Sequence, residues 1–190
     1  MQERSDVRPA ISLRLARRAD TATIAGLIER SVRALQAEDY SPAQIEGALG
    51  TVFGVDTRLI DDGAYFIAEC GGEIVGCGGW SWRRTLFGGD AVAGKDDSLL
   101  TPGLDPARIR AFFVAPEFAR RGVGSLILNA CEAAARARGF RELELGATLT
   151  GERLYQRRGF SSAERISVEL ANGCSLPIVR MRKLIDQPSR

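Results

Sequence analysis

Residues 110–125 read Arg-Ala-Phe-Phe-Val-Ala-Pro-Glu-Phe-Ala-Arg-Arg-Gly-Val-Gly-Ser, and the rest of the chain is organised around this stretch. Residues 110–115 are rich in β-forming side chains, which predicts a short strand that ends at Pro116. A helical pattern starts at about Arg121 and continues through Leu126, Ile127, Ala130 and Ala134. The stretch therefore predicts a strand, a short turn and a helix that begins on glycines.

The glycines at this helix start are suited to binding an anion. The first turn of a helix leaves several N–H groups without intrahelical partners, and the helix dipole is positive at this end. Gly122 and Gly124 lack the Cβ atoms that would hold a ligand away from these amides. With Arg120 and Arg121 at its rim, the site would fit a phosphate or pyrophosphate, although an ordinary tight turn explains the glycines equally well.

The spacing of the glycines excludes two common phosphate-binding motifs. A P-loop requires Gly-x-x-x-x-Gly-Lys-Ser/Thr, and neither Lys95 nor Lys183 follows such glycines. The dinucleotide fingerprint requires a third glycine three residues after the second, where this chain has Ile127. A phosphate site in this stretch is therefore of another type.

Residues 119–124, Ala-Arg-Arg-Gly-Val-Gly, resemble the signature of the GNAT superfamily of acetyl-CoA-dependent N-acyltransferases. In that family a strand is followed by Gln/Arg-x-x-Gly-x-Gly/Ala at a helix N-terminus, and Ala119 departs from the pattern. Residues 154–160, Leu-Tyr-Gln-Arg-Arg-Gly-Phe, match the family's Tyr-x-x-x-Gly-Phe, one helix and one strand further on. A lone helical tyrosine is more often a packing residue, but the two motifs together, in this order, extend the resemblance over about residues 11–184.

The resemblance implies an α/β (α+β) fold with a mixed, mostly antiparallel central sheet of about seven strands, flanked by helices, and one parallel pair beside a CoA cleft. It implies direct transfer of an acetyl group from acetyl-CoA to a primary amine of a small molecule or peptide, with Tyr155 as the catalytic residue. Thr148 stands where many relatives have an asparagine that contacts CoA. The implied cofactor-binding residues are Phe113, Val114, Arg120, Arg121, Gly122, Val123, Gly124 and Ser125. A non-catalytic acyl-CoA-binding regulatory module is the alternative.

Acyl transfer requires a neutral amine, a stabilised oxyanion and a protonated leaving thiolate. Tyr155, with an ordinary phenol pKa of about 10, would be protonated near neutral pH and could donate to a thiolate whose pKa is about 8.5. The resemblance places the oxyanion donor among the strand amides around Phe113 and Val114. The candidate bases are Glu38, Asp39, Glu69 and Asp90, with a water relay as the alternative.

Composition limits the class of protein. The 190 residues, 45% hydrophobic and 26% charged, predict a single globular domain over residues 11–184 with flexible tails at 1–10 and 185–190. A net charge of +2 argues against a dedicated nucleic-acid binder. The first ten residues lack a signal peptide's apolar core, and no apolar run reaches about twenty residues, so we expect a cytoplasmic protein that binds no membrane. A homodimer is an expectation by analogy with the family.

The chain has no histidine, which excludes Ser-His-Asp and Cys-His catalysis and any imidazole base. Its four cysteines form no Cys-x-x-Cys pair, so no metal is expected. If Gly71 and Gly72 form a two-residue hairpin turn, Cys70 faces Glu73 and Cys77 faces Phe66. We therefore interpret the thiols as free and mostly structural.

Apolar patterns predict the remaining elements. Helices are expected from residue 20 or 21 to about 35 and from residues 41–42 past Leu49. Strands are expected at 11–16, 65–70, 73–82, 141–146, 161–170 and 176–184. The small residues of the 73–82 strand would let another segment or a ligand approach closely. In the 141–146 strand, Glu142 and Glu144 should face solvent.

Two connecting segments are candidates for substrate contact. Residues 36–40 read as a solvated loop by default, with Glu38, Asp39 or Tyr40 as the side chains that could face the substrate. Residues 83–107 show no periodicity, and a loop of this length is usually functional or disordered. Its aromatic and basic start, at residues 80–87, is compatible with nucleic-acid binding, but we favour a substrate-side loop.

Overall fold

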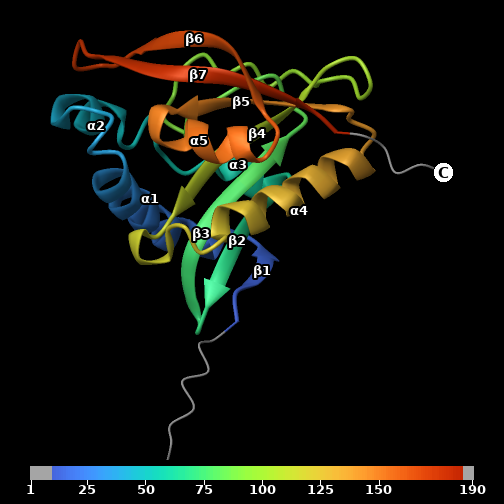
Figure 1. Cartoon of the computed structure of the whole chain (residues 1–190), viewed down its shortest axis with the longest axis horizontal. Helices are drawn as coiled ribbons and strands as arrows, with labels where there is room; N and C mark the ends of the chain where they lie inside the picture. The colour runs from blue at the N-terminus through green and yellow to red at the C-terminus, as the bar shows by residue number, and fades with distance from the viewer. Residues whose placement is uncertain (1–9, 186–190) are drawn as a thin grey trace, which may run out of the picture.

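A mixed sheet of seven strands forms the centre of the computed structural model, which describes residues 10–185 (Figure 1). The strands lie in the order β1-β2-β3-β4-β5-β7-β6, and every neighbouring pair is antiparallel except β4 and β5. The expected mixed, mostly antiparallel sheet with one parallel pair is thus confirmed. The strands are β1 (Ser12–Leu15), β2 (Tyr65–Cys70), β3 (Glu73–Ser81), β4 (Ala107–Val114), β5 (Glu142–Thr148), β6 (Ser161–Glu169) and β7 (Ser175–Leu184).

Five α-helices in the described residues flank this sheet, and α1 packs against β3 and β4 while α4 packs mainly against β3. The predicted helices after residue 20 and after residue 41 are confirmed. The sequence prediction missed α3 because its five residues are too few to show a period. The helices are α1 (Thr21–Leu35), α2 (Pro42–Ala48), α3 (Thr57–Asp61), α4 (Val123–Ala137) and α5 (Leu149–Arg157), with 3-10 turns at Arg18–Asp20 and Pro116–Phe118.

Gly76 of β3 lets α4 lie close to the sheet. A Cβ atom at Gly76 would come within 2.5 Å of Val123 Cγ1 and 3.2 Å of Ile127 Cδ1. Both of these α4 side chains are fully buried against the sheet. The prediction that small residues in this strand admit another chain segment is confirmed, and the contact fixes the N-terminus of α4 next to the central strands.

None of the four cysteines of the described residues is in a disulfide, as predicted, but one register prediction is wrong. Cys70 pairs with Glu73 as expected, whereas Cys77 pairs with Ile67 and not with Phe66. The reason is a β-bulge between Ala68 and Glu69, which shifts the remainder of the β2–β3 ladder by one residue. A bulge of this kind leaves no clear mark in the sequence.

The prediction that Glu144 faces solvent is also wrong. Glu144 is 2% exposed and lies in β5 between β4 and β7. Arg108 of β4 pairs with its Oε2 atom, and Arg182 of β7 lies 2.8 Å from its Oε1 atom. Because β5 is an interior strand, these long arginine side chains cover the carboxylate and leave it buried as part of a charge cluster.

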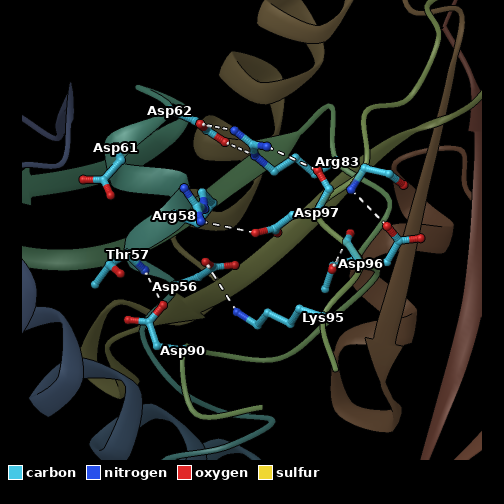
Figure 2. A network of polar contacts seen from close by, with 12 residues as sticks. Asp56, Thr57, Arg58, Asp61, Asp62, Arg83, Asp90, Lys95, Asp96 and Asp97 are labelled. Carbon is cyan, nitrogen blue, oxygen red and sulfur yellow. Dashed lines mark hydrogen bonds and ion pairs between the residues drawn. The ribbon is translucent and has the colours of Figure 1, made fainter. Parts of the chain in front are cut away.

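Residues 83–106 form an ordered excursion that is tied to α3 by polar contacts (Figure 2). Its two arms are joined by a bridge between Arg83 and Leu99. Arg83 also pairs with Asp62 at 2.8 Å, and Arg58 of α3 pairs with Asp97 at 3.2 Å. These contacts hold the excursion against the body of the protein.

The two tryptophans before this excursion pack within the fold. Trp80 is buried and lies 5.2 Å from the ring of Trp82. The guanidinium of Arg138 lies 3.6 Å from the centre of the Trp82 ring. The tryptophans and Arg83 are therefore occupied by contacts within the protein. Within residues 10–185, none of the helices has the length and apolar character that crossing a membrane requires.

Candidate active site

A cleft opens where β4 and β5 diverge. The two strands pair in parallel only from Ala107 to Ile109 of β4. Directly after this segment β4 bulges, because Arg110 pairs with Gly79 and Phe113 with Cys77, which gives β4 one residue more than β3. The bulge is centred on Ala111, whose φ of 55° is unusual for a residue with a side chain. Residues 109–114 of β4 form one wall of the cleft.

Several elements that are distant in the sequence complete the cleft. Gly146 and Thr148 contribute from β5, Gly124 from α4, and Leu154 and Tyr155 from α5. The end of α1 and the excursion at residues 83–106 close the remaining sides with Ser31, Leu35, Gln36, Leu86, Phe87 and Gly88. The excursion therefore borders the cleft, and its contact with substrate stays a prediction.

The N-terminus of α4 has the geometry expected of an anion site, although the helix starts later than predicted. It begins at Val123 and not at about Arg121, because Arg120 and Gly122 both adopt left-handed conformations with φ of 61° and 83°. Leu126 donates to Gly122 O at 2.9 Å. Among the described residues, no backbone carbonyl accepts a hydrogen bond from the N–H groups of residues 122–125. Four amide donors are thus available where the helix dipole is positive.

The two arginines of this motif lie on the surface. Arg120 and Arg121 are exposed, and the Arg121 guanidinium lies 5.2 Å from the centre of the Phe118 ring. Gly124 lines the cleft, so the amide donors and the cleft are continuous. The binding role of residues 120–125 remains a prediction, for which this arrangement is suitable.

Tyr155 lies in the cleft and also packs against the core. Its ring makes edge contacts with Phe112 at 6.3 Å and Phe160 at 5.6 Å between centroids. Burial, with a smaller contribution from Cys131, raises the pKa of the Tyr155 hydroxyl well above its ordinary value. The phenol therefore stays protonated at neutral pH, which is the state that a general acid needs.

Phe113 and Val114 carry the predicted oxyanion donors. Phe113 is buried, and Val114 lines the cleft. The Val114 N–H donates to Ser31 Oγ over 3.3 Å, which is longer than a typical hydrogen bond. A ligand oxygen can compete for a donor that is held this weakly.

Thr148 has a structural role in the described chain. It is the N-cap of α5, and its Oγ1 atom accepts a hydrogen bond from Gly151 N at 3.1 Å. Thr148 also lines the cleft, but its acceptor lone pair is partly used by the helix cap. The position that carries an asparagine in many relatives is therefore occupied here by a capping residue.

The four predicted bases lie in different places. Glu69 pairs with Arg14 at 2.8 Å, and Asp90 accepts from Thr57 N at 2.9 Å, so both are occupied outside the described lining of the cleft. Glu38 is exposed on the surface. Asp39 accepts a hydrogen bond from Thr150 Oγ1 at 2.6 Å, and Thr150 lines the cleft. Asp39 is thus the candidate that lies at the rim.

Tyr40 is a structural residue. Its hydroxyl donates to Pro177 O at 2.8 Å and accepts from Leu149 N at 2.9 Å, which joins the segment after α1 to β7 and α5. Burial raises the pKa of Tyr40 to about 12, with Asp39 as a weaker contributor in the same direction. The expectation that it could face the substrate is not met, because both of its hydrogen bonds are made inside the protein.

Two residues of the cleft were not predicted. Gln36 was assigned to a solvated loop but is 7% exposed, and Arg110 was assigned only to a strand. The available signal was their position, because Gln36 ends a helix and Arg110 precedes the bulge. Within residues 10–185, no group of three or more His, Cys, Asp or Glu side chains is arranged to hold a metal ion.

Comparison with known proteins agrees with this geometry. The profile of the Acetyltransferase (GNAT) family matches residues 30–160, which is more than half of the chain. A comparison with curated proteins gave no match.

Solved structures share the fold. A GCN5-related N-acetyltransferase from Rhodopseudomonas palustris is 24% identical with a TM-score of 0.66, covering 94% of this chain and 96% of its own. The PaiA N-acetyltransferase from Thermoplasma acidophilum, solved in complex with coenzyme A, is 15% identical with a TM-score of 0.65, covering 93% and 99%. A ribosomal-protein-alanine N-acetyltransferase from Brucella melitensis is 17% identical with a TM-score of 0.59, covering 92% and 99%. The family profile and the shared fold establish that the chain belongs to the GNAT acetyltransferase family and is an acyl-CoA-dependent N-acyltransferase.

Proposed function

We propose that the protein transfers the acetyl group of acetyl-CoA directly to a primary amine of a small molecule or peptide. The observation that carries this proposal is that the cleft between β4 and β5 joins the free amides at the start of α4 to the Tyr155 hydroxyl. An anion site and a protonated acid that border one cleft are what a CoA thioester and its leaving thiolate require.

The described residues fit acetyl-CoA. The amides of residues 122–125, with the helix dipole and the exposed Arg120 and Arg121, would hold the pyrophosphate. The unpaired stretch of β4 after Ile109 leaves backbone groups free for the extended pantetheine arm. The Val114 N–H would stabilise the oxyanion in exchange for its long bond to Ser31.

The reaction is balanced without a covalent enzyme intermediate. A C–N bond forms when the lone pair of the amine attacks the thioester carbon, and the C–S bond breaks with its electron pair on sulfur. Tyr155 donates its proton to the thiolate, and the nitrogen loses one proton to water at the mouth of the cleft, where Asp39 lies. Tyr155 regains a proton from water, so the products are an amide and CoA thiol.

The substitution Tyr155→Phe tests this proposal, because it removes the hydroxyl and keeps the ring contacts. We expect kcat for thiol release to fall about 100-fold or more, which is typical for loss of a general acid. The Kd for acetyl-CoA, measured by calorimetry, should stay within about twofold of wild type. An unchanged kcat would show that Tyr155 only packs, and acetyl-CoA binding without transfer in the wild type would support the non-catalytic alternative.

The expected cytoplasmic location and homodimer remain predictions. Cell fractionation and analytical ultracentrifugation test them directly.

A further inference from the structure

Gln36 places a free hydrogen-bond acceptor in the wall of the cleft. Its backbone N–H ends α1 by donating to Val32 O, and the residue is almost fully buried. Its Oε1 atom is buried and accepts no hydrogen bond from the described residues. Gln36 lines the same cleft as Tyr155. A buried acceptor without a partner is unfavourable, so this atom is available to a donor on a bound molecule.

The described lining of the cleft contains no carboxylate. Among the described residues that line it, the charged side chain is Arg110. Its Nη2 atom donates to Gly88 O at 2.8 Å and lies 2.6 Å from Asp56 Oδ2. Asp56 is fully buried and also lies 3.7 Å from Lys95 Nζ. Figure 2 draws this ion pair as a dashed line. Asp56 offsets the charge of Arg110, and Asp90 and Asp97 add further negative charge near this guanidinium.

The other ionisable groups around the cleft add no carboxylate to its described lining. Tyr155 is protonated, and the buried thiol of Cys131 lies behind it. Asp39 is exposed at the rim and bonded to the Thr150 hydroxyl. Much of the remaining wall is apolar and comes from Leu35, Val52, Phe53, Leu86 and Phe87. A cation that enters would thus lose water without gaining a buried carboxylate.

We propose that the acceptor is an amine of low basicity, of the α-amine type found on amino acids and peptides, and that Gln36 Oε1 accepts a hydrogen bond from it. This inference rests on the proposed acetyl transfer. An ammonium ion would lose its hydration in this mostly apolar cleft without gaining a carboxylate partner. A neutral amine donates one N–H to Gln36 and keeps its lone pair for attack on the thioester carbon.

Reference pKa values show how strongly the need for a neutral amine favours α-amines at pH 7. With a pKa of about 7.7–8.0, roughly a tenth of an α-amine is neutral at pH 7, whereas about 0.04% of a lysine-type amine with a pKa of about 10.4 is neutral. The higher nucleophilicity of the more basic amine offsets part of this difference. We therefore expect a preference of at least about tenfold at pH 7.

A matched pair of isomers tests the acceptor class. Nε-acetyl-lysine amide has a free α-amine, and Nα-acetyl-lysine amide has a free ε-amine. The two compounds have the same molecular formula. With acetyl-CoA at pH 7, kcat/KM from thiol release should be at least about tenfold higher for the α-amine isomer, and its pH profile should rise and level off at about 8. A preference for the ε-amine isomer would overturn the inference.

Two variants test the contact made by Gln36. Gln36→Leu should lower kcat/KM for the α-amine isomer about tenfold, with Kd for acetyl-CoA unchanged and Tm unchanged or higher, since no protein hydrogen bond is lost. Gln36→Glu supplies a carboxylate and should shift the preference toward the ε-amine isomer. Wild-type kcat/KM in Gln36→Leu would contradict the inference.

The two proposals fail in distinguishable ways. Transfer confined to the ε-amine isomer would overturn this inference and leave acetyl transfer intact. Binding of acetyl-CoA with no transfer to either isomer would overturn the proposed function and this inference with it.

Discussion

Replacing Gly122 by alanine separates the anion-binding role of the α4 N-terminus from its backbone conformation. Gly122 has a φ of 83°, and a left-handed conformation costs a residue with a side chain about 1–2 kcal/mol. Gly103 is a matched control, because its φ is 82° and neither glycine has another atom within 4 Å of an added Cβ. Both alanine variants should therefore lower Tm by about 2–8 °C, since 1 kcal/mol corresponds to about 2–4 °C at this chain length.

Only the Gly122→Ala variant should weaken acetyl-CoA binding. Its new methyl group would stand beside the free amides of residues 122–125 and hold the pyrophosphate away from them. Loss of one hydrogen bond to a charged group costs about 1.5–3 kcal/mol, which is about 10- to 100-fold in Kd. Isothermal titration calorimetry measures Kd, and differential scanning fluorimetry measures Tm. If Gly122→Ala and Gly103→Ala bind acetyl-CoA equally well, these amides do not hold the pyrophosphate.

Two further predictions concern stability. Glu144→Gln should reduce the free energy of unfolding, measured in urea, by about 3–5 kcal/mol, because it leaves buried arginines without their countercharge. The control Glu164→Gln changes the exposed partner of Arg180 and should cost less than about 1 kcal/mol. Equal losses of stability in the two variants would show that Glu144 does not act as a buried countercharge. Tyr40→Phe should cost about 1–3 kcal/mol at pH 8, because Leu149 N loses its acceptor. Since burial raises the pKa of Tyr40 to about 12, wild-type stability should fall between pH 10 and 12. If the stability of Tyr40→Phe falls just as steeply with pH over this range, Tyr40 is not responsible for the loss.

The sequence was most informative where the structure depends on near neighbours. The strand, the turn and the glycine-bearing helix start of residues 110–125 were predicted, and the structure shows each of them. The error of two residues at the helix start arose at Arg120, whose left-handed conformation is not readable from a side chain that usually avoids it. Tyr155 was found through a short motif that runs from the last turn of α5 to Phe160.

Charges and registers were less predictable. The alternation of β5 suggested a solvent-facing Glu144, because periodicity cannot show that arginines from β4 and β7 will cover it. The position opposite Cys77 was missed by one residue because β3 carries an additional residue, Val75, at the bulge. In both cases the outcome depends on partners that lie far away in the chain.

The sequence by itself determined the local parts of the site, namely the amide donors before and within the first turn of α4 and the helical Tyr155, because each follows from the conformations of a few consecutive residues. The tertiary structure alone decided that Gln36 and Arg110 border the same cleft as Tyr155. It also decided that Asp56 lies beside Arg110 and that Lys95 lies beside Asp56. Glu69 and Asp90 have partners outside the described lining of the cleft. The physical reason is that these relations arise from the splay of β4 from β5 and the packing of α1 and α5 around it, and no interaction between sequence neighbours encodes them.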